Sequence, residues 1–145
     1  MAADRALSVT VAGINWPPET FLQRLIDGLS TGGVRVTVLT AEKPPGEWLA
    51  QGNRAWLWAP KWDIPKPGRA LHLAKMLWLY PSISTERRGW LRSYLAGIPR
   101  FSGRLRQVYQ FFPLLGSTST VLYFPWISAA ADSLPFLRQS SAKLV

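Results

Sequence analysis

The sequence predicts an α/β fold, a Rossmann-like parallel sheet with flanking helices, on three observations. Residues 7–13 form a short apolar run rich in valine, residues 20–29 carry apolar side chains at helical spacing, and residues 33–40 return to alternating valines. The connection between the two apolar runs is too long for a hairpin and suits a helical crossover, so we expect parallel strands and a right-handed crossover. Open sheets of this kind bind ligands outside the carboxyl ends of their strands.

The helix of this unit has recognisable ends. Its apolar stripe consists of Phe21, Leu22, Leu25, Ile26 and Leu29. Pro17 and Pro18 have no backbone N–H, so they belong before or at the first turn. Glu19 is expected in that turn, where its charge would complement the helix dipole. Gly32 and Gly33 should end the helix, because glycine adopts the left-handed conformation at little cost.

The rest of the chain continues this pattern with a basic helical insertion after the third strand. We expect a loop over 41–54, a strand over 55–59, a loop over 62–68, a nearly all-apolar helix over 70–80, helices over 84–97 and 102–115, a strand over 121–124, a helix over 128–138 and the start of a strand over 142–145. The length suits one domain, residues 1–145. We expect this domain to be incomplete at its C-terminus, because the sequence stops inside a strand.

Charge is distributed unevenly along the chain. Residues 1–60 contain five basic and five acidic side chains, whereas residues 61–145 contain twelve basic and three acidic ones, so the net charge of +9 lies in the second part. Such asymmetry predicts an anionic partner.

The basic amphipathic region, residues 84–115, is the expected contact with that partner. Basic helices with aromatic residues at the border are typical of proteins that lie on an anionic membrane. The membrane-contact candidates are Arg87, Arg88, Trp90, Arg92, Arg100 and Arg104. In the alternative interpretation, the apolar stripes cover the sheet and the arginines form a solvated outer face. Nucleic acid is less favoured, because no nucleic-acid recognition motif accompanies the charge.

Two motifs in the first unit resemble a known family. Pro17-Pro18-Glu19 before the helix and Gly33-Val34-Arg35-Val36-Thr37-Val38 after it match the opening of many GT-B glycosyltransferases, in particular the retaining group often called family four. Many members have Gly-Gly after Pro-Pro-Glu, with its backbone near the donor diphosphate, where this chain has Thr20-Phe21. Glu19-Thr20-Phe21 is similar to a subgroup with Glu-Thr-Phe at the start of the helix.

The resemblance implies the N-terminal, acceptor-side half of an enzyme that transfers a sugar from a nucleotide-sugar to a glycan or lipid-linked acceptor, as in the synthesis of cell-envelope polysaccharides. It implies no metal or other cofactor, and a separate C-terminal domain that binds the donor and carries the Glu-x7-Glu signature. The protein could also be the membrane-anchoring half of a two-chain glycosyltransferase. Another alternative is a non-enzymatic basic α/β domain that binds anionic lipid or nucleic acid.

The candidate acceptor site lies in the loops after the first and fourth long strands. Its residues are Gly13, Asn15, Trp16, Glu19, Thr20, Trp126 and Ser128. Asparagine can donate to and accept from a sugar hydroxyl, and tryptophan can stack on a sugar ring. The alternatives are a local Asx turn for Asn15, packing on the helix for Trp16 and helix capping for Ser128.

No catalytic residue is assigned. His72, the single histidine, lies in an apolar stretch, and no Ser-His-Asp set, carboxylate pair, P-loop or metal cluster is recognisable. Absence of cysteine excludes disulfides and thiolate metal sites. Without a recognisable signal peptide or an apolar run of about 18–20 residues, we expect a cytoplasmic protein, peripheral on the inner face of the membrane.

Overall fold

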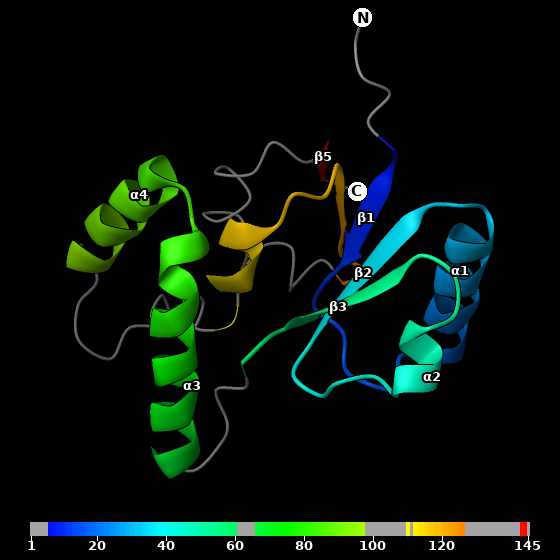
Figure 1. Cartoon of the computed structure of the whole chain (residues 1–145), viewed down its shortest axis with the longest axis horizontal. Helices are drawn as coiled ribbons and strands as arrows, with labels where there is room; N and C mark the ends of the chain where they lie inside the picture. The colour runs from blue at the N-terminus through cyan, green and yellow to red at the C-terminus, as the bar shows by residue number, and fades with distance from the viewer. Residues whose placement is uncertain (1–5, 61–65, 98–109, 111, 127–142, 145) are drawn as a thin grey trace, which may run out of the picture. The chain divides into compact units, whose positions relative to one another are not determined.

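The described residues form a sheet of five parallel strands. In the computed structural model, which describes residues 6–60, 66–97, 110, 112–126 and 143–144, the strands follow the order β3-β2-β1-β4-β5. Their bounds are β1 Ser8–Val11, β2 Arg35–Thr40, β3 Arg54–Trp58, β4 Val121–Tyr123 and β5 Lys143–Leu144. The predicted α/β class and the parallel pairing of β1 with β2 are confirmed (Figure 1).

The described residues divide into two compact units. The sheet unit comprises residues 6–58, 118–126 and 143–144, and the helical unit comprises residues 59–60, 66–97, 110 and 112–117. The helical unit therefore lies in sequence between β3 and β4.

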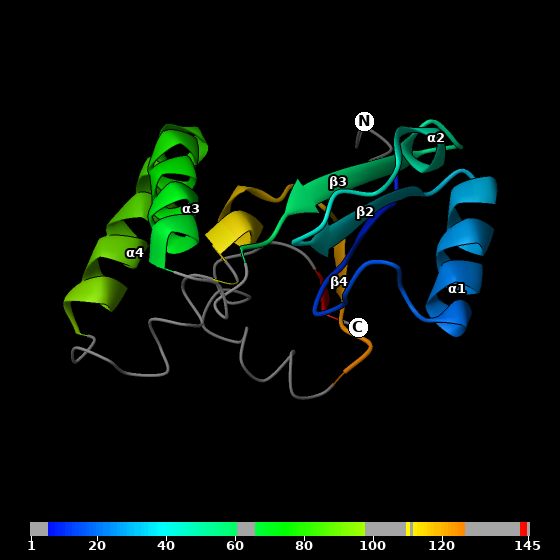
Figure 2. The ribbon, with the colours of Figure 1, turned by 90° about the horizontal axis from the view of Figure 1, so that it is seen from below.

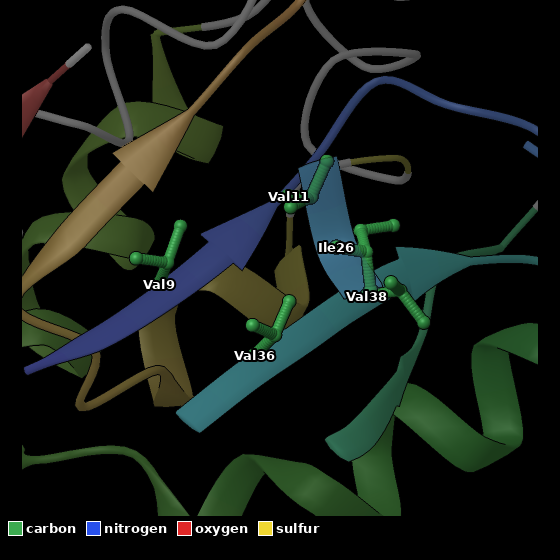
Figure 3. Packing of buried hydrophobic residues seen from close by; sticks show 5 residues of the cluster. All are labelled: Val9, Val11, Ile26, Val36 and Val38. Carbon is green, nitrogen blue, oxygen red and sulfur yellow. The ribbon is translucent and has the colours of Figure 1, made fainter. Parts of the chain in front are cut away.

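The core of the sheet unit is built by valines that alternate along the strands. Val9 and Val11 of β1, Val36 and Val38 of β2, and Ile26 of α1 form one buried cluster (Figure 3). Residues 9–11 and 36–40 are buried without a break. Parallel strands that are covered on both faces show this continuous burial, in contrast to the alternation of a half-exposed sheet.

Helix α1 spans Thr20–Thr31 and buries Leu22, Ile26 and Ser30. Its end is a Schellman motif: Gly33 has φ 83°, its N–H donates to Ser30 O over 3.1 Å, and Val34 N–H donates to Leu29 O over 3.0 Å. The predicted stop at the glycine pair is thereby confirmed.

Two details of this helix differ from the sequence prediction. Glu19 is the N-cap residue, with extended backbone and without a side-chain capping bond, so it precedes the first turn. Phe21 is exposed rather than part of the buried stripe, because burial follows the narrower i, i+4, i+8 row through Leu22, Ile26 and Ser30.

The connection between β2 and β3 contains a short helix that the sequence did not predict. Helix α2 spans Gly46–Leu49 within the expected loop over 41–54. Strand β3 then begins at Arg54, one residue earlier than expected. The indole N–H of Trp56 donates to the backbone and hydroxyl oxygens of Thr40, both over 3.1 Å, and thereby joins β3 to the end of β2.

The described part of the helical unit contains α3 Lys66–Leu79, the 3-10 helix η1 Tyr80–Ser82, α4 Thr85–Ala96 and the 3-10 helix η2 Phe112–Gly116 (Figure 2). Ser84 caps α4 by accepting from Arg87 N–H over 3.4 Å. The α-helix expected over 102–115 falls mostly outside the described residues, and its last part is 3-10 instead. The helix expected over 128–138 lies outside them entirely.

Candidate functional site at the carboxyl edge of the sheet

The topological switch point of the sheet lies between β1 and β4. The chain passes from β1 through α1 to β2 on one side, whereas β4 pairs with β1 on the other. Ala12 N–H donates to Tyr123 O over 3.0 Å, so the segments that follow the two strands leave the sheet side by side. Ligands of open α/β sheets bind at such a switch point.

The loop after β1 is held in a defined path. Gly13 has φ 73°, a conformation that a residue with a β-carbon adopts only at a cost. The peptide bond between Trp16 and Pro17 is cis. The carbonyl of buried Pro18 accepts from Gln23 Nε2 over 2.8 Å, which ties the loop to the first turns of α1.

An exposed aromatic pair lies at this edge. Phe21, in the first turn of α1, and Trp126, after β4, have ring centroids 6.2 Å apart in an edge-to-face arrangement. They are 49% and 43% exposed. The sequence predicts Trp126 as a site residue but places Phe21 in the apolar stripe of the helix. The position of Phe21 in the sequence could have indicated its place at this edge, because the first turn of a helix that follows a parallel strand begins at the carboxyl edge of the sheet.

Trp16 has a packing role. Its ring meets Trp48 of α2 edge to face, with centroids 4.9 Å apart. The guanidinium of Arg54 lies 4.8 Å from the Trp48 ring centroid and pairs with Asp27 over 2.8 Å. Trp16 is therefore half-buried against α2, whereas the alternative interpretation placed it on the helix that follows its own loop.

The other candidate acceptor-site residues differ in their exposure to solvent. Asn15, Glu19 and Thr20 are exposed in the loop and at the start of α1, and Gly13 is half-buried beside them. Ser128 lies outside the described residues. The edge thus combines two exposed aromatic rings with amide, hydroxyl and carboxylate groups, which suits a polyhydroxylated ligand with an apolar face.

The described residues show no cluster of metal ligands, and the single histidine of the chain lies outside the sheet unit. In the part of the chain that the structure covers, no three His, Cys, Asp or Glu side chains gather as metal ligands would. His72 belongs to α3 in the helical unit. Burial, and then the charge of Lys75, lowers the pKa of His72, which favours the neutral imidazole.

The arginines of α4 are engaged with their own unit. Arg87 donates to the carbonyl of Leu115. Arg88 lies 5.8 Å from the Tyr80 ring centroid, and Arg92 donates to the Tyr80 hydroxyl over 3.1 Å. Trp90 stacks on Tyr94, with centroids 5.1 Å apart. Arg100 and Arg104, the other expected membrane-contact arginines, lie outside the described residues.

Fold and site define the sheet unit as an α/β structure with a parallel sheet and an aromatic, polar edge at its switch point. Comparisons with models of protein families, with curated proteins and with solved structures gave no significant match to this chain.

Proposed function

We propose that this chain is the acceptor-binding, Rossmann-like half of a GT-B glycosyltransferase. The complete enzyme would transfer a sugar from a nucleotide-sugar to a glycan or lipid-linked acceptor. A second domain, in the same chain or in a partner, would bind the donor and supply the groups that stabilise the leaving diphosphate. Neither a metal nor another cofactor is part of the proposal.

One observation carries the proposal: the loop with the Pro-Pro-Glu motif and the segment after β4 lie together at the switch point. The Ala12–Tyr123 hydrogen bond joins the ends of the two strands, and the Phe21–Trp126 contact joins the segments beyond them. Aromatic rings can cover the C–H face of a sugar, while Asn15 and Thr20 offer partners for its hydroxyls. Both features support an acceptor sugar at this edge.

The proposal includes a cytoplasmic location at the inner face of the membrane, where lipid-linked acceptors would be reached. Within the described residues, no helix is both long and apolar enough to cross a bilayer. A non-enzymatic basic domain is the second candidate, favoured by the net charge of +9. It predicts binding to any nucleic-acid duplex that weakens steeply with salt.

Calorimetric titration with a panel of soluble oligosaccharides tests the proposal. We expect selective binding of one class of glycan, weakened at least tenfold in Trp126→Ala and Phe21→Ala. Trp78→Ala is the matched control, because Trp78 is an exposed tryptophan of the helical unit. Glycan binding that is equally weakened in the control, or duplex binding without any glycan binding, would overturn the proposal.

A separate assay tests whether donor binding belongs to the second domain and acceptor binding to this chain. The chain incubated with nucleotide-sugars and the bound glycan should give no sugar transfer, because the donor site is assigned to the other domain. Copurification of a Rossmann-like partner would favour the two-chain form of the enzyme. Turnover by the chain alone would contradict the assignment of an acceptor half.

A further inference from the structure

Helix α3 carries its apolar residues on the outside. Leu71 is 70% exposed, Leu73 50%, Leu77 73% and Trp78 79%. At 100° per residue these four positions, with the exposed Ala70 and Ala74, share one broad face. A large apolar face in contact with solvent marks an interaction surface.

The opposite face of α3 is the more buried one although it is less apolar. Met76 is the buried residue of the helix, and Arg69, His72 and Leu79 are half-buried. An ordinary surface helix would bury the leucines and expose the arginine and histidine. The inverted arrangement means that covering the unit's own core does not account for the exposed leucines.

The charges around this face have one sign. Helix α3 contains Lys66, Arg69 and Lys75 and no acidic residue. Lys66 and Lys75 are exposed. From Lys66 to Ala96 the sequence has one acidic residue, Glu86. The ligand of the α3 face must therefore accept apolar side chains and lysine ammonium groups together.

We propose that α3 is an interfacial helix that inserts Leu71, Leu77 and Trp78 into an anionic lipid surface, with Lys66 and Lys75 at the headgroup phosphates. Interfacial helices combine these features, and each cation adds about 1 kcal/mol near such a surface. Helix α3 has 14 residues, about 21 Å at the rise of an α-helix. This is shorter than a hydrocarbon core of about 30 Å, so the helix would lie in the interface.

Other ligands fit this face less well. A nucleic-acid backbone would neutralise the lysines but leave the leucines in water. A second copy of the chain would cover the leucines but bring like charges together, since α3 has no acidic side chain.

This inference goes beyond the proposed function and does not depend on the sugar chemistry, because lipid binding requires no acceptor glycan. The test is co-sedimentation of the whole chain with phosphatidylcholine vesicles, with and without phosphatidylglycerol. We expect binding to the mixed vesicles and a partition coefficient at least tenfold lower for Leu77→Ser/Trp78→Ser. Trp126→Ser, which changes an exposed tryptophan of the sheet unit, should bind like the wild type.

Two charge-reversal variants and a fluorescence-quenching experiment complete the test. Lys66→Glu/Lys75→Glu should lose most binding to the anionic vesicles. Arg24→Glu/Arg35→Glu, which changes the net charge equally at exposed positions of the sheet unit, should retain most of it. Brominated lipid should quench tryptophan fluorescence in the wild type and much less in Trp78→Phe, which keeps the apolar contact.

Three results would overturn the proposal. The first is unchanged binding by Leu77→Ser/Trp78→Ser. The second is equal loss of binding in the two charge pairs, which would indicate attraction by net charge alone. The third is a wild-type chain that binds no vesicle but associates with itself, with the self-association lost in Leu77→Ser/Trp78→Ser. That result would make the α3 face a contact between copies of the chain.

Discussion

Alanine substitution on the two faces of α3 should affect stability very differently. Met76 is 8% exposed and Leu71 is 70% exposed on the same helix. Removing a buried methionine side chain costs about 2–3 kcal/mol, as lost transfer free energy plus the cavity left behind. Full burial of leucine is worth about 2 kcal/mol, so Leu71, with about a third of its surface covered, should lose roughly 0.6 kcal/mol. The better helix propensity of alanine offsets about 0.2 kcal/mol of this loss.

Urea unfolding followed by circular dichroism at the helix band measures both changes. With a slope of about 1–2 kcal/mol per molar urea, Met76→Ala should lower the midpoint by roughly 1–3 M and Leu71→Ala by less than about 0.5 M. Leu77→Ala is a second exposed control, because Leu77 is 73% exposed. If Leu71→Ala costs as much as Met76→Ala, the assigned orientation of α3 is wrong and the lipid-binding face loses its basis.

Three further predictions concern Gly13, Arg54 and His72. Gly13→Ala should cost about 1–2 kcal/mol in urea unfolding, because φ is 73° there. Gly46→Ala is the control, because an added Cβ there meets nothing within 4 Å. It should change the free energy of unfolding by less than about 0.5 kcal/mol. Arg54→Met keeps the stem but loses the hydrogen bonds to Asp27, Ser30 and Gln51. Since Asp27 stays solvated, we expect a loss of about 1 kcal/mol, and a neutral result would show that these hydrogen bonds together contribute nothing. Burial and then a neighbouring lysine lower the pKa of His72 below 6.5. The unfolded chain therefore binds more protons, and the free energy of unfolding should fall as the pH drops below 6.5. In urea midpoints measured from about pH 7.5 to pH 5.5, His72→Gln should show a smaller fall than the wild type.

The first unit was predictable because its signals are local. Valine alternation, the two prolines and the glycine pair each specify an element over a few residues, and the parallel pairing follows from the length of the connection. The strand at Val121–Tyr123 was also recognisable from its apolar run. Its place beside β1, more than 100 residues away in sequence, follows from the sheet order rather than from any local pattern.

The errors have a common physical cause, because periodicity identifies an apolar stripe but not which part of it is covered. Phe21 belongs to the stripe of α1 by spacing, yet it lies in the first turn at the edge of the sheet and meets Trp126 instead of the core. In α3 the sequence shows apolar residues nearly all round, and only tertiary packing determines that Met76 is buried and Trp78 exposed. The contacts of the α4 arginines likewise depend on the position of Tyr80, which the sequence does not give.

Backbone amide chemical shifts recorded during titration with the glycan identified by calorimetry test the central claim most directly. An acceptor site at the switch point predicts that the perturbed amides are those of residues 12–16 and 19–22, after β1, and residues 124 and 126, after β4. The amides of α3 and α4 should stay unchanged, because the lipid-binding face is assigned to the helical unit. Shifts confined to residues 66–96, or shifts caused by a nucleic-acid duplex and not by the glycan, would contradict the account.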